Sequence, residues 1–135
     1  MPTKKFPAKF DFLDEVREFV GEKARSAGFS DKEVYSIQLA TDEAASNIIE
    51  HAYEGTASGT FKVNCEFKNR QLVISLLDQG KRFDPSKVAQ PDLKADLAER
   101  KIGGLGIYLM RKLMDEVRYE SSVSGNLLTM VKRKG

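Results

Sequence analysis

Residues 42 to 53 carry three chemically capable side chains at a helical spacing. Glu43, Asn47 and His51 follow one another every four residues, so on a helix they share one face, about 6 Å apart per step. Phosphoryl transfer uses such groups, because a carboxylate can take a proton from a hydroxyl and an amide oxygen can hold Mg²⁺ beside phosphate oxygens. A polar stripe on an amphipathic helix is usually a solvated face. This segment alone leaves both interpretations open.

A second motif, Asp78-Gln79-Gly80, follows an apolar run. A carboxylate at the end of a central strand can accept a hydrogen bond from a ligand, and a glycine lets the ligand approach the backbone closely. Aspartate and glycine are also favoured in the turns that end strands. The motif therefore indicates either a binding site or an ordinary turn.

A third motif, Gly103-Gly104-Leu105-Gly106, runs directly into a predicted helix. Glycines can expose backbone N–H groups, and a helix N-terminus carries about half a positive charge, so the two together can hold a phosphate. A flexible hinge before the helix explains the same glycines. The chain has no Walker-type phosphate loop, because Gly80-Lys81-Arg82 lacks the hydroxyl residue and the upstream glycine.

Hydrophobic periodicity places these motifs on a series of helices and strands. Apolar residues at helical spacing predict helices over 12–27, 30–53 and 104–113, the second opening with a capping box formed by Ser30 and Glu33. Other apolar runs predict strands over 4–10, 61–67, 72–77, 117–121 and 127–133. Pro7 places the first strand at an edge. The second should bury one face, formed by Phe61, Val63, Cys65 and Phe67.

This order of elements predicts an α/β fold. Strands that follow each other in pairs favour hairpins and a mainly antiparallel, mixed sheet. The helices are expected to cover one face of it, which gives a two-layer sandwich. A chain of 135 residues is one domain by size, so residues 1–135 should form a single unit.

Composition narrows the range of partners and locations. A net charge of +2 gives no sign of a nucleic-acid or membrane surface. The single cysteine, Cys65, cannot form an internal disulfide, and no apolar segment is long enough to span a bilayer. The first residues lack the apolar region of a signal peptide. We therefore expect a cytoplasmic protein.

Residues 84 to 102 separate the aspartate motif from the glycine cluster. They contain two prolines and eight charged residues and show no clean hydrophobic period. A segment with so little apolar surface should be mobile in the empty protein. We expect it to act as a lid over bound phosphates, with contacts from Arg100 or Lys101.

Taken together, the three motifs resemble the boxes of the GHKL ATPase superfamily (the Bergerat nucleotide fold). Within it the chain looks like the anti-sigma-factor serine/threonine protein kinase family. The segment from Glu43 to Tyr53 matches the N box, Asp78 to Pro85 matches the G1 box, and Gly103 to Ile107 matches the G2 box. The resemblance extends from the first helix to Met130 and rests on the combination of boxes rather than on any one.

The resemblance implies roles for individual residues. Asn47 would hold the Mg²⁺ that bridges the ATP phosphates, and Glu43 would be the general base. Asp78 would accept a hydrogen bond from the adenine amino group, with Gly80 giving room for the base. A hydroxyl near the adenine would come from Thr129. The phosphates would be wrapped by Gly103, Gly104 and Gly106.

The chain departs from the family pattern at two places. Arg82 stands where many relatives have a second glycine, and Ile102 stands where anti-sigma kinases can carry an arginine. The basic residue that contacts the γ-phosphate is therefore left open. His51 matches the N box, and both a packing role and an ATP contact are open for it.

The resemblance implies an enzyme that uses ATP and Mg²⁺ to phosphorylate a hydroxyl of a small antagonist protein. The expected substrate is a STAS-domain anti-anti-sigma factor, and a sigma factor is a second expected partner. Relatives often form homodimers. The alternative is a binding module that holds nucleotide and a partner without chemistry.

Overall fold

The computed structural model describes residues 3–53, 59–80 and 102–134, and for residues 102–107 it describes the backbone. Within these residues five strands form one sheet in the order β1-β2-β3-β5-β4, and each neighbouring pair is antiparallel. The strands are β1 (Thr3–Pro7), β2 (Thr60–Lys68), β3 (Gln71–Asp78), β4 (Glu116–Ser122) and β5 (Gly125–Arg133).

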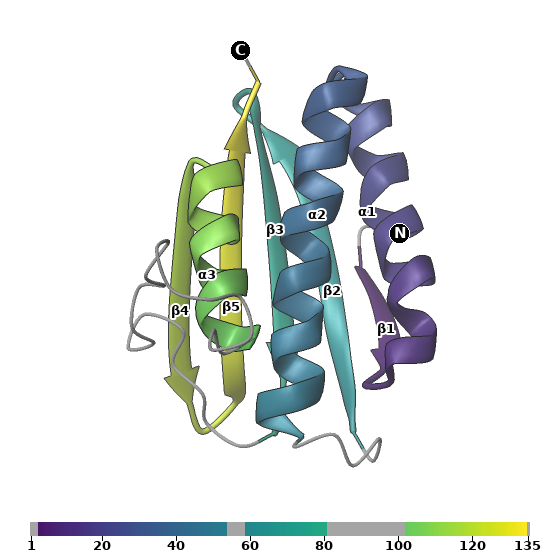
Figure 1. Ribbon diagram of the computed structural model, residues 1–135. Coiled ribbons are helices and arrows are strands. Elements are labelled where there is room, and N and C mark those ends of the chain that lie inside the picture. Colours follow the sequence, from purple (N-terminus) through teal and green to yellow (C-terminus); the bar gives the residue numbers. More distant parts are fainter. Residues whose placement is uncertain (1–2, 54–58, 81–101, 135) are drawn as a thin grey trace.

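Helices cover one face of this sheet (Figure 1). They are α1 (Leu13–Ser26), α2 (Asp31–Asn47) and α3 (Ile102–Leu113), with two short helical segments, η1 (Phe10–Phe12) and η2 (Ile48–Ala52). In Figure 1, α2 lies between α1 and α3 and runs along β3, the central strand. The predicted two-layer sandwich is confirmed.

Local signals explain where the helices begin and end. Gly28, at φ 91°, ends α1, and its N–H donates to the carbonyl of Arg25 over 3.0 Å. The predicted capping box opens α2. Its Ser30 hydroxyl accepts from the Glu33 N–H over 3.1 Å, and the Glu33 carboxylate accepts from the Ser30 N–H over 3.0 Å.

The second helix departs from the prediction at its C-terminal end. The sequence predicts one helix to Tyr53, but the α-helix ends at Asn47 and the chain continues through η2 as a π-helix. The Tyr53 N–H donates to the carbonyl of Ile48, five residues earlier. This wider turn changes the spacing after Asn47, so His51 does not continue the stripe of Glu43 and Asn47 at the α-helical angle.

The hydrophobic core fills the space between the layers. β2 contributes Phe61, Val63 and Cys65, all buried as predicted. Phe67 is a correction, because its side chain is 41% exposed. Among the ring pairs of the described residues, Phe67 pairs only with Phe29, edge to face, at a centroid distance of 5.9 Å. It lies next to the last residue of β2, where the alternation of buried side chains ends.

Other boundaries differ from the prediction by a few residues. β1 ends at Pro7 rather than residue 10, at the predicted edge position, and α3 begins at Ile102 rather than near Gly104. Of the predicted lid, residues 84 to 101 lie outside the described residues, and so does Arg82. None of the helices in the described ranges is both long and apolar enough to cross a membrane.

Candidate active site

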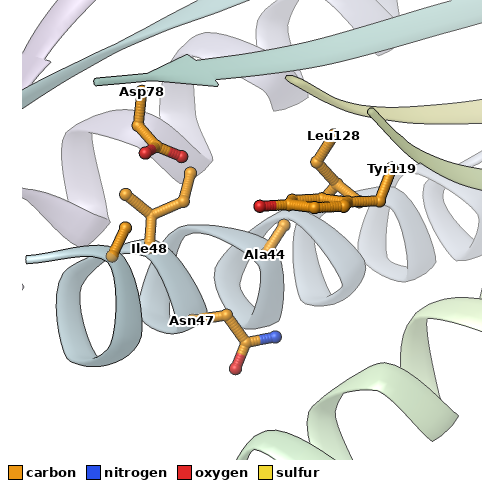
Figure 2. A pocket seen from close by; sticks show the side chains of 7 residues that line it. Ala44, Asn47, Ile48, Asp78, Tyr119 and Leu128 are labelled. Atoms are coloured by element: carbon orange, nitrogen blue, oxygen red, sulfur yellow. The ribbon is translucent and has the colours of Figure 1, made fainter. Parts of the chain in front are cut away.

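A pocket lies where the C-terminal part of α2 meets the end of β3. It encloses an empty volume of about 280 Å³, part of which is open to solvent. Figure 2 shows the lining side chains, which are Ala44, Asn47, Ile48, Ala52, Asp78, Tyr119 and Leu128. The structure thus brings together Asn47 and Asp78, which come from two separate motifs.

Asp78 is 4% exposed. Oδ1 accepts hydrogen bonds from the Gly80 N–H and from Nδ2 of Asn126, both at 2.9 Å. Oδ2 accepts none from the part of the chain that the structure describes. Burial raises the pKa of Asp78, and the two donors partly oppose this shift. Among the described residues, the hydrogen bonds to Asp78 therefore all reach one of its two carboxylate oxygens.

Asn47 presents a buried amide to the same pocket. The residue is 3% exposed, and neither Oδ1 nor Nδ2 has a hydrogen-bond partner among the described residues. In Figure 2 the amide points away from Asp78 and from the other labelled side chains. Leaving such a group unsatisfied costs about 1–3 kcal/mol. A ligand that supplied a metal ion or polar atoms would satisfy it.

Glu43 lies one helical turn before Asn47 and is half-buried, but it is not among the side chains that line the pocket. Burial raises the pKa of its carboxyl group, and the nearby charges of Asp42 and Glu50 raise it further. A carboxylate with a raised pKa is a stronger base, as general-base catalysis requires.

Gly80 is required by close packing against the π-helical turn. A Cβ at this position would lie 2.5 Å from the carbonyl oxygen of Ala52 and 2.9 Å from its Cβ. Backbone oxygen cannot move aside as a flexible side chain can. Glycine here has a structural reason in addition to the predicted room for a ligand.

The glycine cluster lies inside α3 rather than before it. The helix begins at Ile102, so Gly103 and Gly104 belong to its first turn and Gly106 follows them. The first N–H groups of a helix have no partner within the helix. Those of Gly103 and Gly104 are therefore suited to bind an anion, whereas the fifth residue of the helix can bond within it.

Thr129 is not brought to the pocket. The sheet register pairs Thr129 with Ser75, whereas Leu128, its neighbour, pairs with Leu76 and with Tyr119. Consecutive side chains of a strand point to opposite faces. Because Leu128 lines the pocket, Thr129 faces the other side of the sheet, and we correct its expected position near the adenine. His51 lies in η2, is not a lining residue, and its role stays open.

Sequence reasoning missed several residues of the site. Tyr119 and Leu128 line the pocket from β4 and β5. Tyr53 links the start of β2 to the residue after β3. Its hydroxyl accepts from the Gln79 N–H over 3.0 Å and donates to the Thr60 carbonyl over 2.7 Å. Alternation along β5 puts Leu128 on the same face as Met130, but the sequence does not tell which face carries the pocket. No sequence pattern marks Tyr119 as a pocket residue.

Comparison with known families gives a match over most of the chain. The model of the histidine kinase-like ATPase domain matches residues 6–132. The chain is also similar to serine-protein kinase RsbW of Listeria monocytogenes, with 30% identity covering 90% of this chain and 82% of the relative. RsbW of Halalkalibacterium halodurans is 32% identical, covering 93% of this chain and 78% of the relative.

Solved structures share the fold at lower identity. The RsbU and RsbW domains of a Mycobacterium tuberculosis protein superpose with a TM-score of 0.69 at 19% identity, covering 99% of this chain and 33% of that one. The catalytic domain of histidine kinase ThkA gives a TM-score of 0.59 at 17% identity, covering 99% and 97%. The predicted superfamily and kinase family are confirmed. The chain belongs to the histidine kinase-like ATPase domain family and, within it, to the serine-protein kinases of the RsbW type.

Proposed function

We propose that this protein binds Mg-ATP in the pocket between α2 and β3 and transfers the γ-phosphate to a serine or threonine hydroxyl of another protein. The buried amide of Asn47, without a partner among the described residues, carries this proposal. The same pocket is lined by Asp78, whose described hydrogen bonds reach Oδ1, so Oδ2 would accept from the ligand. RsbW relatives with about 30% identity are named serine-protein kinases, which supports the reaction class.

The end of the pocket at Asp78 would hold the adenine base. Oδ2 of Asp78 would accept a hydrogen bond from the exocyclic amino group, and Gly80 keeps the turn after β3 close to η2. Ile48 and Leu128 supply apolar walls, and the Tyr119 ring lies beside Leu128 (Figure 2). An apolar slot with one polar group is typical of a site that recognises a planar base.

The end at Asn47 would hold the phosphates. Magnesium prefers oxygen ligands and keeps several waters, so the amide oxygen of Asn47 with phosphate oxygens makes an adequate site. Its charge would neutralise the phosphates during transfer. The N-terminus of α3 would wrap the phosphates, with the backbone N–H groups of Gly103 and Gly104 as donors and Gly106 completing the glycine cluster.

Glu43 would act on the protein substrate rather than on the nucleotide. As the acceptor hydroxyl attacks the γ-phosphorus, its proton moves to the carboxylate of Glu43, and ADP leaves. The position of Glu43 one turn from Asn47, outside the lining of the pocket, agrees with a group that faces an incoming hydroxyl. The same position also favours the second candidate, a module that binds nucleotide without chemistry.

The partners are proposed from the family resemblance. The substrate would be a STAS-domain anti-anti-sigma factor, with a sigma factor as the competing partner and a homodimer as the assembly. A cytoplasmic location would place the protein with these partners.

Two measurements test the proposal together. Calorimetric titration with ATP should give clearly tighter binding with Mg²⁺ than without it, and Asn47→Ala should abolish the difference. Labelled ATP, incubated with the wild-type protein and a STAS-domain anti-anti-sigma factor, should label a serine or threonine of that factor. Equal affinity with and without the metal would remove the role of Asn47. Metal-dependent binding without any label would favour the binding module.

A further inference from the structure

A row of three polar side chains crosses the sheet beside the pocket. The register pairs Asp78 of β3 with Asn126 of β5, and Asn126 with Ser121 of β4. Asn126 lies two residues before Leu128, on the same face of β5, so the row lies on the side of the sheet that carries the pocket. Asn126 is 3% exposed, and none of the sequence motifs includes it.

The hydrogen bonds of this row fix the orientation of the Asn126 amide. Its Nδ2 donates to Oδ1 of Asp78 over 2.9 Å and to the carbonyl of Gly80 over 3.1 Å. Both partners are acceptors, so only the NH₂ end of the amide can face them. At the other end, Oδ1 of Asn126 accepts from the Ser121 hydroxyl over 2.8 Å.

We propose that Asn126 is a positioning residue for base recognition, which holds the carboxylate of Asp78 so that its second oxygen faces the exocyclic amino group of adenine. This inference rests on the proposed function of the pocket. Two donors on Oδ1, from Asn126 and from the Gly80 backbone, restrict rotation of the carboxylate. The preformed acceptor then costs less ordering when the base binds.

The charge of Asp78 adds to this argument. Burial raises the pKa of Asp78, and the hydrogen bond from Asn126 is the first of the contacts that lower it. An ionised carboxylate is acceptor-only, whereas the protonated acid would direct an O–H group at the ligand. Asn126 therefore favours the form of Asp78 that can accept from an amino group.

The test compares two nucleotides that differ in that amino group. ATP and purine riboside triphosphate, which lacks the 6-amino group, are titrated calorimetrically in the presence of Mg²⁺. We expect the wild-type protein to bind ATP roughly ten- to a hundredfold more tightly, as one hydrogen bond to a charged group predicts. In Asn126→Leu this ratio should fall toward one, while the affinity for the analogue changes little.

Two further variants make the test decisive. Ser121→Ala removes the outer hydrogen bond at an exposed position and should lower the ratio partly, which also decides the matter if Asn126→Leu does not fold. Thr129→Val changes the opposite face of the same strand and should keep the wild-type ratio. If Asn126→Leu keeps the wild-type ratio of the two affinities, the inference is overturned, even where both nucleotides bind more weakly. If Asn126→Leu is unfolded, the same ratio in Ser121→Ala overturns it. A wild-type ratio of one instead overturns the proposed adenine contact of Asp78 itself.

Discussion

The two carboxylates assigned to the site differ in what surrounds them. Asp78 is held by donors from Asn126 and from its own turn, which suits a fixed contact with a ligand. Glu43 has burial and like charges as the causes of its raised pKa, which suits a group that accepts a proton. Environment rather than residue type therefore separates the binding carboxylate from the proposed base.

Replacing Glu43 should separate binding from chemistry. In Glu43→Gln we expect the affinity for Mg-ATP to survive, because Glu43 does not line the pocket, while phosphate transfer falls by roughly a hundredfold or more. Calorimetry and a transfer assay with labelled ATP measure the two quantities. Glu22→Gln, at an exposed position on α1, is the matched control and should keep both. Normal phosphate transfer by Glu43→Gln would show that Glu43 is not the general base.

The pocket depends on the contact between η2 and the residues that follow β3. The π-helical turn moves the Ala52 carbonyl against Gly80, and the Tyr53 hydroxyl binds the Gln79 N–H. Such turns inside α-helices are frequent at functional sites. Here the turn sets the position of the Asp78 segment relative to α2.

A methyl group at Gly80 should push these elements apart. Gly80→Ala is expected to lower the free energy of unfolding by about 1–3 kcal/mol, the usual cost of overpacking, and to weaken ATP binding. Denaturant unfolding and calorimetry measure the two effects. The second change Ala52→Gly should not restore stability, because the closest atom is the Ala52 carbonyl oxygen. Wild-type stability in Gly80→Ala would show that the backbone of Ala52 leaves room for a methyl group at residue 80.

Among the described residues, three carboxyl groups have a raised pKa: Asp42, Glu43 and Asp78. In each, burial is the first cause, and at Asp42 the ion pair with Arg17 opposes it. A raised pKa means that the folded state binds the proton more tightly than the unfolded state. The resulting stabilisation is present below the unfolded pKa, about 4, and is lost as pH rises through the folded pKa.

The raised pKa values of Glu43 and Asp78 predict how pH changes the stability of the double variant Glu43→Gln, Asp78→Asn. The amides carry no charge to desolvate, so the variant's stability relative to wild type should increase as pH rises from about 4 through the raised pKa values of the folded state. Denaturant unfolding at several pH values measures this difference. The amide oxygen at residue 78 can still accept from Asn126 and the Gly80 N–H, so the packing is conserved. A difference that stays flat or decreases with pH would contradict the raised pKa values.

Sequence patterns alone determined the elements and the kinds of chemistry. Periodicity located the helices and strands within a few residues, and the Ser30 capping box was read correctly from local chemistry. Asn47, Asp78 and the glycines stood out because their residue types are unusual in an apolar context. These features depend on near neighbours in the chain, which is why they could be predicted.

Tertiary structure decided which of these side chains meet. Strand β5 lies between β3 and β4, and this order puts Asn126 beside Asp78 and Leu128, not Thr129, in the pocket. A shift of one residue in register would have reversed the two faces of β5. Strand order, register and the π-helical turn result from contacts between residues far apart in the chain. The local pattern of residues carries no record of such contacts.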